Sequence, residues 1–187
     1  MHLRWCGWAL AACLLVGALA CNGTTAAGTL VHGPTVIEAP GTYLLGGNLS
    51  VPGGAVGIEV RSSDVTLDGN GWTVRGSGEP DSCGVLVHGS PGPVRNVTVR
   101  NIRIADLHYG CYAWDAANVS VDGCLVESCA IGVTFNPAAD GSVLSNRLEK
   151  NGYGVVLSGG STGTRVASNR VTDSARRGFI CSAPATG

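Results

Sequence analysis

The chain has 187 residues, of which 44% are hydrophobic and 13% are charged. This hydrophobic content excludes an intrinsically disordered chain, and the 29 glycines lack the three-residue period of collagen. Twelve basic and 13 acidic residues leave a net charge of −1, which gives no electrostatic basis for binding nucleic acid. A single folded domain is expected for this length.

Residues 1–20 have the pattern of a signal peptide. Arg4 supplies a positive charge, residues 9–20 form an uncharged apolar run, and Ala18-Leu19-Ala20 matches a small-residue cleavage site. As a helix the apolar run would rise about 18 Å, which is too short for a bilayer core of about 30 Å. The pattern predicts export, with an uncleaved anchor or a buried core helix as the alternatives.

Cys21 follows the predicted cleavage site directly and resembles the lipidated cysteine of a prokaryotic lipobox. That pattern prefers leucine three residues before the cysteine, whereas Leu19 lies two before it. Lipid anchoring and simple secretion both remain open, and both predict an extracytoplasmic protein, secreted or at the cell surface. We predict a flexible tether over residues 21–34, a folded domain over residues 35–181 and a tail over residues 182–187.

The folded part of the chain repeats itself. Apolar positions recur at steps of 32, 22, 22 and 23 residues in one series and again, at the same steps, in a second. A third series begins each time with a glycine. Fixed steps at several independent positions indicate a repeat architecture. The three series are Leu67, Val99, Val121, Val143 and Val166; Trp72, Ile104, Val126, Leu148 and Val171; and Gly57, Gly84, Gly110, Gly132, Gly154 and Gly178.

Each repeat has room only for short strands. Turn-forming residues interrupt every few positions, apolar and polar side chains alternate, and no 3.6-residue period is found. Strands of successive repeats would stack about 4.8 Å apart and bury their inward side chains against their neighbours. The sequence therefore predicts an all-β, right-handed parallel β-helix (solenoid) of about six coils. A leucine-rich repeat is the main rival at this period, but its L-x-x-L-x-L-x-x-N signature is absent.

One turn position of the repeat is rich in asparagine. An inward asparagine at a coil corner can bond the backbone of the next coil and form a ladder, whereas asparagine also simply favours turns. Both interpretations stay open, and two apolar members would interrupt any ladder. The position is occupied by Asn70, Ile102, Cys124, Asn146 and Asn169.

Five cysteines follow Cys21, and export would permit disulfides among them. The alternative is that they are small buried hydrophobic residues, which the repeat favours for Cys111 and Cys124. The others are Cys83, Cys129 and Cys181.

The opening of the repeat resembles a known family. Ala39-Pro40-Gly41-Thr42-Tyr43, Gly57-Ile58 and the segment DVTLDGNG at residues 64–71 look like the beginning of NosD-type β-helix domains. These belong to the pectin-lyase-like group of carbohydrate-binding and sugar-hydrolase (CASH) domains, and similar modules occur in archaeal surface proteins. The resemblance covers residues 35–181. It implies an extracytoplasmic role that faces polysaccharide, with lyase, hydrolase or epimerase activity in some relatives.

Aromatic side chains give the strongest candidate for a ligand-binding site. If Cys111 and Ala113 point inward, alternation along the strand turns Tyr112 and Trp114 outward. Exposed aromatic rings beside polar groups suit stacking on sugars, and the alternative is an aromatic cover over an apolar column. The candidate ligand-binding residues are Arg61, His88, Tyr112, Trp114 and Asp115.

Asp68, Arg100 and Asp122 form one outward column and are the weak catalytic candidates. The resemblance implies, for a lyase or epimerase acting on uronate, carboxylates that bind calcium and a basic residue that abstracts a proton. The alternative is an exposed charge ladder, in which each pair contributes about 0–1 kcal/mol. A further outward column could hold an acidic polysaccharide or be a solvated face; it contains Arg103, Arg147 and Arg170, with Leu125 between them.

No cofactor is predicted, apart from calcium in the lyase-like alternative. NosD itself is linked to maturation of a copper enzyme, but His88 and His108 are not at ligand spacing, so no metal site is predicted. Four N-x-[ST] sequons are candidate glycosylation sites for an exported chain. Their acceptors are Asn22, Asn48, Asn96 and Asn118.

The sequence thus favours an exported cell-surface β-helix module that binds or displays carbohydrate without catalysis. A polysaccharide lyase or epimerase and a purely structural surface repeat are the alternatives. The expected partner is a polysaccharide or cell-surface glycan. No nucleic-acid partner is expected, and membrane contact would come only through the signal segment or a lipid anchor.

Overall fold

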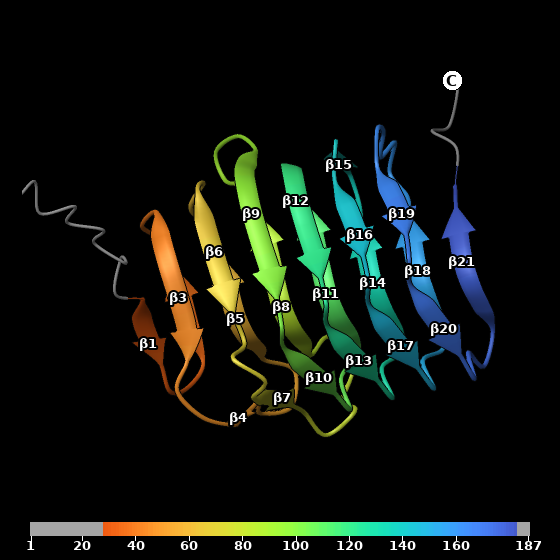
Figure 1. Ribbon diagram of the computed structural model, residues 1–187, viewed down its shortest axis with the longest axis horizontal. Coiled ribbons are helices and arrows are strands. Elements are labelled where there is room, and N and C mark those ends of the chain that lie inside the picture. The colour runs from red at the N-terminus through yellow and green to blue at the C-terminus, as the bar shows by residue number, and fades with distance from the viewer. Residues whose placement is uncertain (1–27, 183–187) are drawn as a thin grey trace, which may run out of the picture.

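The computed structural model describes residues 28–182, which wind into three parallel β-sheets (Figure 1). Each coil visits the sheets in the same order, and its strands pair with those of the coils before and after it. The predicted fold class is confirmed: this part of the chain is an all-β parallel solenoid of about 6 turns. Within it, no helix is long and apolar enough to cross a membrane.

The strands of the three sheets follow one another along the solenoid axis. Sheet 1 contains β1 (Thr29–Val31), β3 (Gly41–Leu45), β6 (Val65–Asp68), β9 (Val94–Arg100), β12 (Ala116–Asp122), β16 (Ser142–Leu144) and β19 (Arg165–Ala167), with β15 (Ala138–Ala139) beside β12. Sheet 2 contains β4 (Leu49–Ser50), β7 (Thr73–Arg75), β10 (Arg103–Ala105), β13 (Leu125–Glu127), β17 (Arg147–Glu149) and β20 (Arg170–Thr172). Sheet 3 contains β2 (Thr35–Ile37), β5 (Val56–Val60), β8 (Cys83–His88), β11 (Tyr109–Trp114), β14 (Ile131–Phe135), β18 (Tyr153–Leu157) and β21 (Arg177–Cys181).

The core is a set of inward columns, one residue per coil. Side chains alternate along each strand, so every second residue enters the solenoid and stacks on its counterpart one coil away. The column Leu67, Val99, Val121, Val143 and Val166 pairs in the register that the sequence repeat predicted. All but Val166, which lies in the last coil, are buried.

An asparagine ladder at the corner between sheets 1 and 2 is confirmed. The Asn146 amide accepts the Cys124 N–H at 2.9 Å and donates to the Val121 carbonyl at 2.8 Å. Asn169 repeats both bonds one coil further on, with the Asn146 N–H and the Val143 carbonyl. Each amide therefore replaces, at a corner, the strand pairing that the bend interrupts.

A second corner, between sheets 2 and 3, holds an asparagine that the internal repeat of the sequence did not reveal. Asn151 is fully buried, accepts the Cys129 N–H and donates to the Val126 carbonyl, both at 2.9 Å. Its counterpart one coil earlier is Cys129, so a single asparagine left no repeat for sequence comparison to detect.

Two positions of the predicted repeat were wrong. Val74, not Trp72, pairs with Ile104. Trp72 instead corresponds to Ile102, because the Trp72 carbonyl accepts the Arg103 N–H in the same way that the Ile102 carbonyl accepts the Leu125 N–H. Asn70 lies exposed in the same turn, outside the inward ladder. The cause is a turn between β6 and β7 that is two residues longer than the turns of later coils, because five positions separate Asp68 from Thr73 whereas three separate Arg100 from Arg103.

The solenoid begins within the segment assigned to the tether, because β1 already pairs with β3. Several predictions fall outside the described residues: the signal peptide (residues 1–20), Cys21, Asn22 and most of the 182–187 tail.

The five later cysteines are free thiols. Cys181 is exposed, the other four are buried, and none of the five forms a disulfide. Burial raises the pKa of Cys124 and Cys129 to about 12.

Candidate functional site

Trp114 and His88 lie side by side on the outer surface of sheet 3. They pair in register on β11 and β8, and their inward neighbours Ala113 and Val87 belong to the core. The Trp114 side chain is 47% exposed, and its ring stacks on the His88 ring with centroids 5.8 Å apart and planes 19° apart. The strand alternation therefore holds a flat aromatic surface toward solvent.

Glu59 orients this pair from the neighbouring strand β5. Its Oε1 lies 2.6 Å from His88 Nε2 and accepts a hydrogen bond of 2.8 Å from Arg61 Nε. Burial raises the pKa of Glu59, but the hydrogen bonds from His88 and Arg61 outweigh burial and hold the pKa below its usual value. An ionised carboxylate only accepts hydrogen bonds, so His88 Nε2 carries the proton.

One ring atom of His88 stays without a partner. Its Nδ1 is buried and makes no hydrogen bond with the described residues. Since Nε2 is bound to Glu59 and Nδ1 is enclosed, His88 contributes to the outer surface through the face of its ring.

Further rings extend this surface along β11. The Tyr109 ring lies 5.0 Å from that of Tyr112 and stacks on that of His108 at 4.5 Å with an 8° angle between the planes. Burial, followed by the neighbouring Tyr112, raises the pKa of Tyr109, which keeps its hydroxyl protonated as a donor. We call the outer surface formed by Glu59, Arg61, His88, His108, Tyr109, Tyr112 and Trp114 the aromatic face.

The structure brings together four of the five predicted ligand-binding residues, namely Arg61, His88, Tyr112 and Trp114. Asp115 lies at the next corner instead, in a left-handed turn (φ 46°), where it lines a hollow of about 260 Å³. Sequence reasoning missed Glu59, although strand alternation from Arg61 places it on the same surface. It also missed Tyr109 as a site residue, because the ring turns along the strand toward Tyr112.

Asp68, Arg100 and Asp122 pair in register on sheet 1, as predicted. Arg100 Nε donates to Asp68 Oδ2 at 2.9 Å, while Asp68 Oδ1 accepts the Asn70 N–H and an Asn101 amide hydrogen. These bonds occupy both carboxylate oxygens of Asp68 with its own turn and with the next coil. Within residues 28–182, no group of three or more His, Cys, Asp or Glu side chains is arranged to hold a metal ion.

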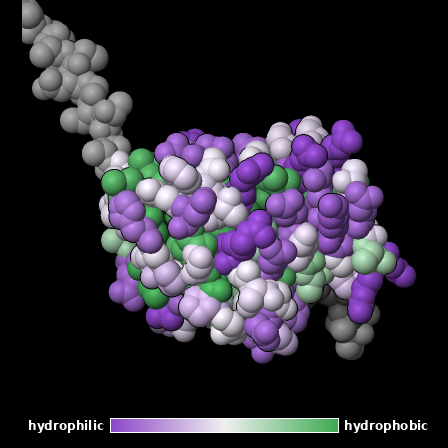
Figure 2. Space-filling model, turned by 90° about the horizontal axis from the view of Figure 1, so that it is seen from below, coloured by the Kyte–Doolittle hydropathy of each residue, from purple (hydrophilic) through white to green (hydrophobic). Residues whose placement is uncertain are grey.

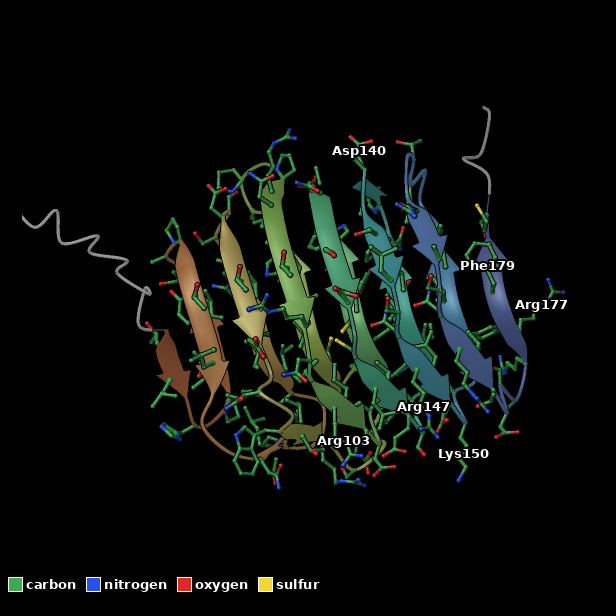
Figure 3. All side chains as sticks on the ribbon, in the orientation of Figure 1. Arg103, Asp140, Arg147, Lys150, Arg177 and Phe179 are labelled. Carbon is green, nitrogen blue, oxygen red and sulfur yellow. The ribbon has the colours of Figure 1, made fainter. Side chains whose placement is uncertain are left out.

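The arginine column on sheet 2 is also in register, with Leu125 between Arg103 and Arg147, and Arg170 beyond. Arg147 forms an ion pair with Glu149 on its own strand. The three arginines are exposed along the lower edge of the solenoid, where Figure 3 labels Arg103 and Arg147, and Leu125 is half-buried.

Three of the predicted glycosylation acceptors can be placed. Asn96 and Asn118 are exposed, but Asn118 donates to Asn96 and Asn96 donates to Asp64, at 2.9 and 2.8 Å. Asn48 is exposed and uses only its oxygen, which accepts the Thr73 N–H. Its amide nitrogen is therefore the least engaged of the three.

Comparison with known proteins identifies one family. A family model described as a right handed beta helix region matches residues 43–186. No curated protein and no solved structure matches the chain.

Proposed function

We propose that this chain, which belongs to the right-handed β-helix family, is an exported cell-surface module that binds carbohydrate through the aromatic face without catalysing a reaction. The family alone does not select a function, because one fold carries many activities. Within it, the NosD-type, pectin-lyase-like group is the subfamily that the opening motif favours. Export rests on the signal-like pattern of residues 1–20.

The exposed ring of Trp114 is the observation that carries the proposal. A sugar presents a face of C–H groups that stacks on an aromatic ring, while its hydroxyls need hydrogen-bond partners at the ring edge. Trp114 offers such a ring, already held parallel to His88. Arg61 and the Tyr112 hydroxyl supply hydrogen-bonding groups on the same outer surface.

The electrostatics of the aromatic face suit a neutral or acidic glycan. Glu59 is satisfied by His88 and Arg61, so its charge is compensated within the face. Arg61 is about half exposed, which leaves guanidinium N–H groups for a ligand oxygen.

A glycan array compares the wild-type protein with Trp114→Ala. Binding should be lost in this variant and retained in Trp72→Ala, which removes another exposed indole (40% exposed) from a different part of the surface. Absence of binding by the wild type, or equal loss in both variants, would contradict the proposal and favour a purely structural repeat.

A further inference from the structure

A recessed corner separates sheets 3 and 1 beside the aromatic face. The chain turns this corner with one residue, Asp115, between β11 and β12, and with residues 136–137 between β14 and β15. The coils on either side use five residues (89–93, before β9) and seven residues (158–164, before β19), and these longer loops project at the top of Figure 1. Coils about 4.8 Å apart place the two loops about 14 Å from each other, with the short corners between them.

Small side chains form the floor of this recess. One outward column of sheet 1 has alanine in the two coils with short corners and larger residues in the coils on either side. The alanines leave room for the hollow of about 260 Å³ between the two loops. This volume is below the range of about 300–1,000 Å³ for drug-sized ligands, and it suits a single sugar substituent. The column consists of Arg95, Ala117, Ala139 and Thr162, and Pro93, Pro137 and Gly160 also line the hollow.

Three charged side chains surround the alanine floor. Arg95, Asp115 and Asp140 all line the hollow, and none of them forms an ion pair with another described residue. The Asp140 carboxylate lies against Gly163, where a Cβ would collide with its Oδ1. Figure 3 labels Asp140 at the upper edge of the solenoid, opposite the arginine column of sheet 2. The hollow therefore offers two carboxylate acceptors and one guanidinium donor to a ligand.

Hydrogen bonds fix both sides of the hollow. In the loop of residues 158–164, Ser161 Oγ accepts the Ala138 N–H and donates to the Phe135 carbonyl, both at 3.0 Å. On the other side, the Arg95 N–H donates to Ser63 Oγ at 2.9 Å. A hollow held in this way is formed before a ligand arrives, which reduces the loss of conformational entropy on binding.

We infer that the hollow binds the acetamido group of an N-acetylhexosamine in a glycan that stacks on Trp114, an inference that rests on the proposed binding of carbohydrate by the aromatic face. The hollow begins with Asp115, the residue directly after Trp114, so one glycan can reach both. An acetamido group has an apolar methyl, one N–H donor and one carbonyl acceptor. The alanine floor covers the methyl, the carboxylates of Asp115 and Asp140 accept the N–H, and Arg95 donates to the carbonyl.

Other common sugar substituents match the hollow less well. A hydroxyl group is too short to cover the alanine floor and leaves Arg95 without an acceptor. A free amino group is a cation that carries no methyl and meets the guanidinium of Arg95. A uronate carboxylate meets the like charges of Asp115 and Asp140. The acetamido group is the substituent among these that uses the floor, the acceptors and the donor together.

Calorimetric titration of the purified full chain with cellotetraose, chitotetraose and fully deacetylated chitotetraose tests the inference, because the three share one backbone and differ only in this substituent. Chitotetraose should bind about tenfold more tightly than the other two. Ala139→Leu fills the hollow and should remove this preference while cellotetraose still binds.

Two matched controls locate the effect. Ala167→Leu makes the same change in another outward column of sheet 1, where Leu144 is the counterpart one coil earlier, and should keep the preference. Arg95→Ala should weaken the preference, whereas Arg103→Ala should not. Arg103 belongs to the lower surface, where Figure 2 shows many hydrophilic side chains. Thermal unfolding checks that each variant is folded.

Equal affinity for the three tetrasaccharides, or a preference that persists in folded Ala139→Leu and Arg95→Ala, would overturn the inference and leave the aromatic face as the binding site if Trp114→Ala still abolishes binding. Tighter binding of the deacetylated form would assign the hollow to cations instead. Failure of all three to bind also overturns the inference, and the glycan array then decides separately whether the aromatic face binds other carbohydrates.

Discussion

Replacement of Asn151 by alanine should destabilise the whole solenoid. The side chain is fully buried, and outside the strand ladders it accepts the Cys129 N–H and donates to the Val126 carbonyl, each at 2.9 Å. The substitution leaves the buried Cys129 N–H unsatisfied, at a cost of about 1–3 kcal/mol. The Val126 carbonyl stays within the β13–β17 ladder and loses one further bond, at about 0.5–1.5 kcal/mol, so the total cost is about 1.5–4.5 kcal/mol. For a domain whose total stability is about 5–15 kcal/mol, this is a large fraction.

Urea unfolding followed by circular dichroism measures the loss as a shift in midpoint at constant slope. Asn136→Ala is the matched control, because that side chain makes no hydrogen bond with the described residues, and it should stay within about 0.5 kcal/mol of the wild type. If Asn151→Ala also stays within that range, the corner amide does not replace strand pairing and the reasoning fails.

Three further predictions follow from packing and ionisation. Gly132→Ala should lose about 1–3 kcal/mol of stability in the same assay, because its Cβ would lie 2.6 Å from a carbonyl oxygen of the next coil, whereas Gly47→Ala, with nothing within 4 Å, should not. Hydrogen bonds from His88 and Arg61 lower the pKa of Glu59 despite its burial, so its contribution to stability is present above pH 4.5 and is lost as the pH falls through the folded-state value. Glu59→Gln should therefore reduce the loss of stability between pH 7 and pH 3, and an unchanged acid profile would contradict this. Of the cysteines after residue 28, only Cys181 should react with a thiol reagent at pH 8 in the folded protein, since the others are buried; labelling of a second cysteine before unfolding would refute this.

Much of the architecture was readable because the repeat appears several times over. The inward valines and the glycine column recur at nearly constant steps, and each recurrence tests the same alignment independently. The prediction failed where a coil departs from the average. The longer turn before Thr73 shifted Trp72 and Asn70 out of their expected positions, and nothing in the local sequence shows which residues are the insertion.

The candidate site was predicted only in part. Strand alternation placed Trp114, Tyr112, His88 and Arg61 outside the solenoid, and the structure agrees. Glu59, which connects His88 to Arg61, emerged only from distances between neighbouring strands. The same distances showed that Asp68 is engaged by its own turn and by Arg100.

The sequence by itself determined the period, the inward columns and the strand order, because a solenoid is fixed by contacts between equivalent positions of adjacent repeats. Only the tertiary structure decided which rings stack, which carboxylates are neutralised and where the outer surface is hollowed. Those properties depend on side-chain directions and on the neighbouring coils, which a residue's place in the chain does not specify. Asp115 illustrates both, since the sequence places it directly after the outward Trp114 and the structure alone shows that it lines a hollow at the corner.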